Sequence, residues 1–292
     1  MRGTSLWRDG VRRLRRNKLA MAGGVVIVML SVIAIFADAL APLPYTKTNF
    51  GRLNEGPTRT YPLGTDQLGR DLLSRLLDGA RISVTVAFVV QAVIIFLGVP
   101  IGAIAGWFGG RTDNLLMRVT DVIYAFPDIL FIILLSVAFR ETVFGQALDG
   151  LLLVFVAIGL VGWVTVARLT RGQMLALKET EFVEAAKAIG VSDRKIVMRH
   201  LLPNGMGPII VAITLGVPVA ILAEATLAYI GIGVQPPRAS WGSLIADGQK
   251  FVRAEPHLVV FPAICIALAL IGFTFLGDGL RDALDPKLKG KQ

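Results

Sequence analysis

The chain has 292 residues, of which 54% are hydrophobic and only 17% are charged. A soluble domain carries about 25% charged residues, so this composition excludes an ordinary soluble domain and indicates a polytopic membrane protein surrounded by lipid. The net charge of +9 is compatible with nucleic-acid binding. The basic residues lie beside apolar runs, however, where they indicate membrane orientation instead. The single cysteine, Cys265, excludes a disulfide within the chain and is typical of a small core residue.

A basic segment precedes the first apolar run. Residues 1–18 hold seven Lys and Arg residues, and the run 19–40 follows at once. About 20 apolar residues are enough to cross a bilayer, so residues 19–40 are predicted to form the first transmembrane helix. A signal peptide is the alternative, because Ala39-Leu40-Ala41 resembles a cleavage site. Secretory apolar regions span only about 7–15 residues, and Pro42 follows directly here, so the transmembrane interpretation is preferred.

The polar segment 41–81 is predicted to be an extracytoplasmic loop, and it contains a cluster of charge. Its residues Asp66, Gly69, Arg70 and Asp71 could be read as a metal or phosphate site. No other residues of that kind accompany them, so turn formation and helix capping explain the cluster better.

Five more apolar runs follow the first, which predicts an all-α membrane protein with six transmembrane helices. Residues 82–276 form the predicted core, and its apolar runs are 82–108, 115–139, 151–167, 207–233 and 258–276. Pro100 and several glycines in the second run predict a kink or tight packing against a neighbouring helix.

The distribution of basic residues predicts the orientation. With the N-terminus inside, segments 1–18, 109–118, 168–206 and 277–292 carry 20 Lys and Arg residues, whereas the outside segments carry 10. This positive-inside bias predicts that both termini, including the C-terminal tail 277–292, are cytoplasmic.

The segment 178–204 is too polar to cross a membrane and is predicted to fold as two short helices. In the first helix, apolar residues recur at i, i+3, i+4 and i+7, which predicts a single apolar face made of Phe182, Ala185, Ala186 and Ile189. The two alanines would let the backbone of a partner approach closely. Gly190 is expected to end this helix, because glycine adopts a positive φ without a Cβ penalty.

The second short helix is expected to begin at a capping residue, either Ser192 or Asp193, and to continue through His200. Pro203 is expected to end it, because proline cannot donate a backbone hydrogen bond. Segment 178–204 is therefore predicted to be a pair of short helices between two apolar runs.

The spacing in this segment resembles the cytoplasmic "EAA" loop of permease subunits in bacterial ATP-binding-cassette (ABC) importers. That loop reads Glu-Ala-Ala, three residues, Gly, nine residues, Ile, one residue and Leu-Pro, and the matching residues are Glu184, Ala185, Ala186, Gly190, Leu202 and Pro203. His200 replaces the Ile, so a titratable side chain stands where the family has an apolar one. The alternative is an amphipathic helix that lies on the membrane surface.

Three other stretches resemble the second, "C"-type permease of dipeptide, oligopeptide and nickel importers. They are GTDQLGRD at 64–71, AEATLAYIGIGVQPPRASWGSLI at 223–245 and GDGLRDALDP at 277–286. The resemblance implies a type I ABC importer permease fold in a bacterial cytoplasmic membrane and the import of peptides. Import of nickel or another small solute is the alternative, and an ATP-independent carrier or channel is the rival class.

The sequence contains no GxxxxGK[ST] phosphate-binding loop, so this chain does not bind ATP by that route. It has only two histidines and shows neither a nucleophile–base pair nor a metal-ligand cluster, so we expect no catalytic site, cofactor or metal in this chain. The resemblance instead implies partners: a homologous second permease, two ATPase subunits that use ATP and Mg, and an extracytoplasmic solute-binding protein.

Ionisable residues inside the apolar runs are the remaining signal, because a charge at the bilayer centre costs at least about 2.5 kcal/mol. Asp121 and Asp128 are predicted to share one helix face, and Glu224 lies near the middle of its run. All three are candidates for a polar path for a cationic or zwitterionic solute. The structural alternatives are an Arg118–Asp121 pair, local hydrogen bonds of Asp128 beside Pro127, and a Glu224 bridge between helices. The structural interpretation is preferred for Asp121 and Glu224, and both the structural and the pathway interpretation stay open for Asp128.

Overall fold

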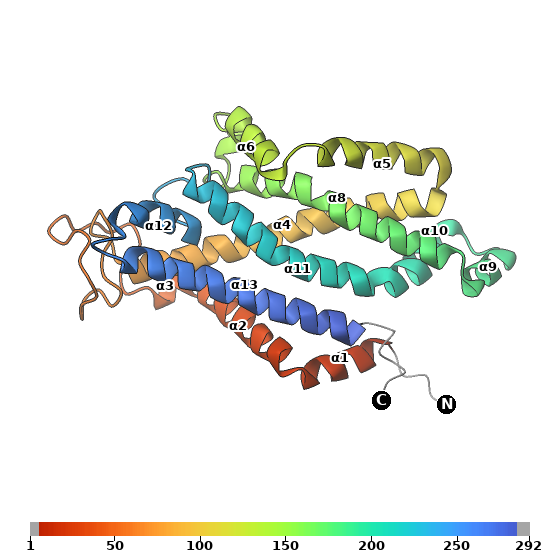
Figure 1. Ribbon diagram of the computed structural model, residues 1–292, viewed down its shortest axis with the longest axis horizontal. Helices are drawn as coiled ribbons and strands as arrows, with labels where there is room; N and C mark the ends of the chain where they lie inside the picture. The colour runs from red at the N-terminus through yellow and green to blue at the C-terminus, as the bar shows by residue number, and fades with distance from the viewer. Residues whose placement is uncertain (1–5, 285–292) are drawn as a thin grey trace.

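The computed structural model describes residues 6–284, which fold mainly into helices and contain no strand (Figure 1). Residues 1–5 and 285–292, with Arg2, Pro286 and the lysines of the predicted tail, lie outside the described residues. The helices are α1 (Leu6–Arg16), α2 (Lys18–Ile35), α3 (Ala37–Leu40), α4 (Leu72–Phe108), α5 (Gly110–Tyr124), α6 (Asp128–Phe139), α7 (Val143–Gln146), α8 (Leu151–Lys178), α9 (Glu181–Ala188), α10 (Asp193–Ile196), the π-helix η1 (Val197–Leu201), α11 (Leu202–Tyr229), α12 (Trp241–Gly248), the 3₁₀ turn η2 (Gln249–Phe251) and α13 (His257–Leu284).

Five helices of the described chain are long and apolar enough to cross a membrane: α2, α4, α8, the continuous helix Asp193–Tyr229, and α13. The pair α5 and α6 meets the same criterion together, but the two helices are bent by 83° at the break between them. Counted as one broken span, this pair gives six, in agreement with the six predicted runs. The break lies at Phe126-Pro127, because proline supplies no N–H group and disfavours helical backbone in the residue before it.

The second span begins earlier than predicted. α4 starts at Leu72 instead of residue 82, and Asp71 caps its first turn. The Asp71 Oδ2 atom accepts hydrogen bonds from the Ser74 backbone N–H at 2.8 Å and from the Ser74 hydroxyl at 2.6 Å. Helix capping, predicted for this cluster, is therefore confirmed at Asp71.

Glycines bring α4 and α8 into close contact, and the two helices lie side by side in Figure 1. Gly98, Gly102 and Gly106 recur every four residues on α4 and face α8. A Cβ atom at Gly102 would stand 2.3 Å from the carbonyl oxygen of Ala167, and one at Gly106 would stand 2.6 Å from Met174 Cβ. Real Cβ atoms essentially never approach so closely, so these positions require glycine. This confirms the tight packing predicted for the second run.

The two ends of the bundle carry different elements (Figure 1). α9 and α10 extend from one end, which is called the α9 end below. α12 and the segment 41–71 lie at the opposite end, called the α12 end. The long helices connect the two ends.

Gly102→Ala should destabilise the fold, because the added Cβ meets the backbone of α8 and overpacking of this kind costs about 1–3 kcal/mol. Gly172→Ala is the matched control on α8, since no atom of a neighbouring element in the described chain lies within 4 Å of its added Cβ, and alanine favours a helix. Thermal unfolding of the purified chain in detergent measures both variants. A melting temperature of Gly102→Ala equal to that of the parent protein would contradict the packing role.

Candidate functional site

α9 has a buried face that fixes it against the ends of two spans. Val183 is fully buried, and Ala186, one turn later, is half-buried. Both pack into a small apolar cluster that contains Trp107 from α4 and Met174 from α8. The helix is therefore part of the folded body of the protein and does not hang from a flexible loop.

The opposite face of α9 is apolar and uncovered by the described residues. Phe182 is 42% exposed and Ile189 is 80% exposed, with the exposed Ala185 between them. We call these three residues the exposed strip. The predicted apolar face is wrong in one respect, because Ala186 turns inward with Val183 and leaves the other three outside. Large exposed apolar side chains at a fixed position indicate a surface that another molecule covers.

The end of α9 is closed by hydrogen bonds that require glycine. Gly190 has a φ of +77°, and its N–H donates to the Lys187 carbonyl at 2.9 Å. The next N–H, from Val191, donates to the Ala186 carbonyl at 3.0 Å. This pair of bonds is a Schellman motif, so the predicted role of Gly190 is confirmed. Ser192 occupies the N-cap position of α10, although its side chain makes no capping hydrogen bond.

Pro203 does not end the second short helix, contrary to the prediction. α10 passes into the π-helix η1, which contains the half-buried His200, and α11 begins at Leu202. Pro203 then falls in the first turn of α11, where a missing N–H is tolerated, and the wide π-turn before it interrupts the regular hydrogen-bond ladder. Asp193–Tyr229 thus forms one continuous helix that leads from the loop into a span.

Trp107, the anchor of this region, was not anticipated from the sequence. The ammonium group of Lys187 on α9 lies 5.0 Å from the centroid of the Trp107 ring, and that of Lys178 lies 5.6 Å from it. Lys178 Nζ also donates a hydrogen bond to the Trp107 carbonyl at 2.5 Å. These cation–π contacts tie α9 to the last turn of α4. Glu184, by contrast, is exposed and makes no ion pair within residues 6–284.

The structure separates the two aspartates of the third run. Asp121 lies on α5, and Asp128 is the first residue of α6. Because the chain breaks between these helices, the prediction that the two aspartates share one helix face is wrong. Asp121 does not pair with Arg118 as predicted. Its Oδ1 atom accepts a hydrogen bond from Arg168 of α8 at 2.7 Å, and the Arg168 guanidinium lies 4.5 Å from the ring centroid of Tyr124. Asp121 therefore has a structural partner.

Asp128 lies in a different environment from Asp121. Its side chain is exposed, and within the described residues it makes no hydrogen bond or ion pair. An exposed carboxylate on a membrane span is costly in lipid, so it must face water or a partner chain instead. The pathway interpretation thus remains for Asp128.

Glu224 is buried inside the bundle, with only 1% of its surface exposed. Its Oε2 atom lies 3.5 Å from the hydroxyl of Ser83 on α4. The same hydroxyl lies 3.4 Å from the backbone N–H of Trp241, which opens α12. Glu224 therefore joins α11 to α4 and the start of α12, which supports the structural interpretation over the pathway interpretation.

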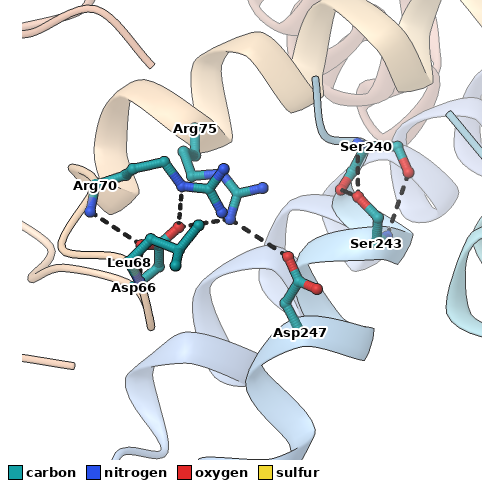
Figure 2. Close-up of polar contacts among 7 residues, drawn as sticks. All are labelled: Asp66, Leu68, Arg70, Arg75, Ser240, Ser243 and Asp247. Atoms are coloured by element: carbon teal, nitrogen blue, oxygen red, sulfur yellow. Dashed lines mark hydrogen bonds and ion pairs between the residues drawn. The ribbon is translucent and has the colours of Figure 1, made fainter. Parts of the chain in front are cut away.

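A buried ion-pair centre organises the α12 end, and Figure 2 shows it around Asp66. Asp66 Oδ1 accepts hydrogen bonds from the backbone N–H groups of Leu68 at 2.8 Å and Arg70 at 2.9 Å. Its Oδ2 atom accepts from Arg70 Nε at 2.7 Å and from Arg75 Nη1 at 2.6 Å. Turn formation was predicted for this cluster and is found, but the pairing with Arg75 was not anticipated.

Arg75 also forms an ion pair with a residue that is far away in the sequence. Arg75 Nη1 lies 3.4 Å from Asp247 Oδ2 on α12 (Figure 2). Arg75 is 3% exposed, so a buried cation connects the first turn of α4 to the outer face of α12. A capping box between Ser240 and Ser243 fixes the start of α12 beside it (Figure 2).

Comparison with protein families gives two matches. The model described as "Binding-protein-dependent transport system inner membrane component" matches residues 98–290. The model described as "N-terminal TM domain of oligopeptide transport permease C" matches residues 5–57. The two matches together include all six predicted transmembrane runs in whole or in part.

Similar proteins cover almost the whole chain. The oligopeptide transport system permease protein OppC of Bacillus subtilis is 41% identical over 98% of this chain and 91% of that protein. The dipeptide transport system permease protein DppC of Alkalihalophilus pseudofirmus is 40% identical over the same shares of both chains. Among solved structures, a chain of the inward-facing MetNI methionine ABC transporter is 18% identical and aligns over 72% of this chain and 96% of that chain, with a TM-score of 0.58, which is a likeness of fold alone.

Proposed function

This chain belongs to the family of binding-protein-dependent transport system inner membrane components, and from that premise we propose that it carries peptides into the cell as one permease subunit of an ATP-driven importer. The observation that carries the proposal is the identity of about 40% to permeases of oligopeptide and dipeptide transport over nearly the full chain. A further relative at 38% identity is a glutathione transport permease, which is again a peptide system. Peptides are therefore favoured over nickel as the solute.

The proposed importer has subunits besides this chain. We propose a homologous second permease beside it, two ATPase subunits that bind ATP and Mg, and an extracytoplasmic solute-binding protein. The word "binding-protein-dependent" in the family description supports the last of these. This chain itself is proposed to have no catalytic role.

The proposed contact with an ATPase subunit is the loop 178–204, which includes Glu184, Ala185, Gly190 and the exposed strip. The exposed strip offers apolar area that the described residues leave uncovered, and Glu184 beside it is free to pair with a basic residue. Ala186 supports this surface from within through its contact with the Trp107 cluster. His200, Leu202 and Pro203 form the link from this surface to α11.

The mechanism proposed is alternating access driven from this loop. Closure of the ATPase subunits would move α9, and the Trp107 cluster would pass that motion to α4 and α8. Because Asp193–Tyr229 is one continuous helix, the same motion would reach α11 without a flexible linker. The permeases then rock between inward-facing and outward-facing states.

The α9 end is proposed to face the cytoplasm, in a bacterial cytoplasmic membrane, with both termini on that side. The support is the predicted positive-inside bias of 20 to 10 basic residues. The α12 end, with segment 41–71, would then face outside and meet the solute-binding protein. Asp128, exposed at the break between α5 and α6, is proposed to line the path of the solute.

Uptake in proteoliposomes tests the function. Vesicles that contain the complete transporter should accumulate labelled tripeptide only when ATP is supplied on the side of α9 and the solute-binding protein on the side of α12. Uptake that continues without ATP would indicate a carrier or channel. ATP that acts only from the α12 side would reverse the proposed orientation.

Ile189→Asp should abolish association with the ATPase subunits and reduce uptake at least tenfold, because a carboxylate without a partner would be buried in the contact. Val11→Asp on α1 is the matched control, since Val11 is also an exposed aliphatic residue, at 50%. Co-purification of ATPase subunits with a tagged chain measures the effect. Both variants should insert normally, because both positions lie outside the spans. Normal co-purification with Ile189→Asp would exclude the exposed strip from the contact.

Asp128→Asn should lower the uptake of a peptide with a free ammonium group about tenfold, because a hydrogen bond to a charged group contributes about 1.5–3 kcal/mol. Assembly with the other subunits should be unchanged, since on this proposal Asp128 faces the path of the solute, and its side chain makes no hydrogen bond or ion pair within the described residues. Glu141→Gln, which changes another exposed acid, serves as the control for charge. Loss of the assembled complex with Asp128→Asn would favour a structural role instead.

A further inference from the structure

A groove of about 690 Å³ lies at the α12 end and has no role in the function proposed above. Its walls are the segment 67–75, the connection 228–238 between α11 and α12, and residues of α12 and η2 as far as Lys250. Arg140, at the end of α6, closes one side. Ligand pockets for small molecules occupy roughly 300–1,000 Å³, so the groove is large enough for a short peptide.

Five basic residues of the described chain line the groove, and three of them already form ion pairs. Arg70 and Arg75 both pair with Asp66, and Arg75 also pairs with Asp247. Arg238 lies 3.4 Å from Asp149 Oδ2 and 3.9 Å from Asp78 Oδ1. These three arginines are therefore engaged in ion pairs within the chain, and they are less available to bind a ligand.

The other two basic residues, Arg140 and Lys250, have no acidic partner within residues 6–284. The Arg140 guanidinium donates one hydrogen bond, from Nη2 to the Oε1 atom of Gln235 at 3.3 Å, and its remaining N–H groups have no partner among the described residues. Lys250 is exposed, and no hydrogen bond or ion pair engages its ammonium group in the described chain. Within the described residues, the groove thus presents two cations without an acidic partner, Arg140 beside Gln235 and Lys250 just after α12.

One partly exposed carboxylate, that of Asp247, also lines the groove. Among the described residues, Asp247 is the only acidic one that lines the groove, and its side chain is 40% exposed. Its Oδ2 atom faces Arg75, as Figure 2 shows, and its Oδ1 atom has no hydrogen-bond partner among the described residues. Asp247 and Lys250 are three residues apart on the same helical segment, which places opposite charges about one turn from each other. Such a surface matches a zwitterion better than a simple anion.

We propose that this groove is a reception site for short zwitterionic peptides on the outer side of the membrane. Arg140 and Lys250 bind the C-terminal carboxylate, and Asp247 receives the N-terminal ammonium group. Charge-assisted hydrogen bonds of this kind, above all from arginine to a carboxylate, are stronger than neutral ones. The inference rests on the proposed function for its ligand class, and it adds a site in this chain that a peptide meets outside the span.

Saturation-transfer difference NMR on the full chain in lipid nanodiscs tests the site, with Ala-Ala-Ala as the probe. The methyl signals of the peptide should show saturation transfer from the parent chain. The half-saturation concentration should rise about tenfold for Arg140→Gln/Lys250→Gln, and similarly for the C-terminal amide of the peptide, because each change removes the ion pairs with the carboxylate.

Lys47→Gln/Arg59→Gln is the matched control, because it removes the same charge from two exposed residues of segment 41–71 that do not line the groove. The affinity of this control variant for Ala-Ala-Ala should equal that of the parent chain. An equal loss in this control, or an amide that binds as well as the free acid, would overturn the proposal.

A carboxylate on a partner protein is the rival occupant of the groove. If Arg140→Gln/Lys250→Gln leaves Ala-Ala-Ala binding unchanged but weakens association of the solute-binding protein, the groove holds that protein and the peptide proposal is wrong. Proteoliposome uptake of the parent transporter is measured separately. Normal peptide uptake without any binding in the groove would refute this site alone, whereas absence of uptake would refute the proposed function.

Discussion

The approach of α4 to α8 is the contact on which the other elements depend. Gly102 and Gly106 remove the side chains that would hold the two helices apart, so the backbone of α8 rests directly on α4. That contact sets the position of Trp107, and α9 in turn packs against Trp107. The surface proposed for the ATPase contact is thus fixed by packing inside the proposed membrane region.

The α12 end is held by charge instead of by close packing. Asp66 satisfies two arginines and two backbone N–H groups at once, and Arg75 extends the network to Asp247. Buried ion pairs often contribute little net stability, because desolvation offsets their attraction. The loss of one partner, however, strongly destabilises the fold, because it leaves a buried charge unpaired. The network therefore serves to fix geometry: it orients segment 67–75 against α12 and shapes the groove between them.

Local signals in the sequence were sufficient for much of this fold. The six apolar runs, the cap at Asp71 and the αL position of Gly190 all depend on residues within one or two helical turns. The features that were missed depend on distant residues. Asp121 pairs with Arg168, 47 residues away, and Ala186 turns inward because Trp107 lies beneath it. The π-helix before Pro203 has no local signature at all, so the end of a helix was predicted where the chain continues.

That continuity makes Asp193–Tyr229 a lever. A helix of 37 residues is about 55 Å long at 1.5 Å per residue, so a tilt of roughly 10° at one end displaces the other by about 10 Å. Small movements at the α9 end are therefore amplified at the α12 end. Pro208 and Pro218 interrupt the hydrogen bonds along this lever, so they set the places where it can flex and thereby the amplitude that is transmitted.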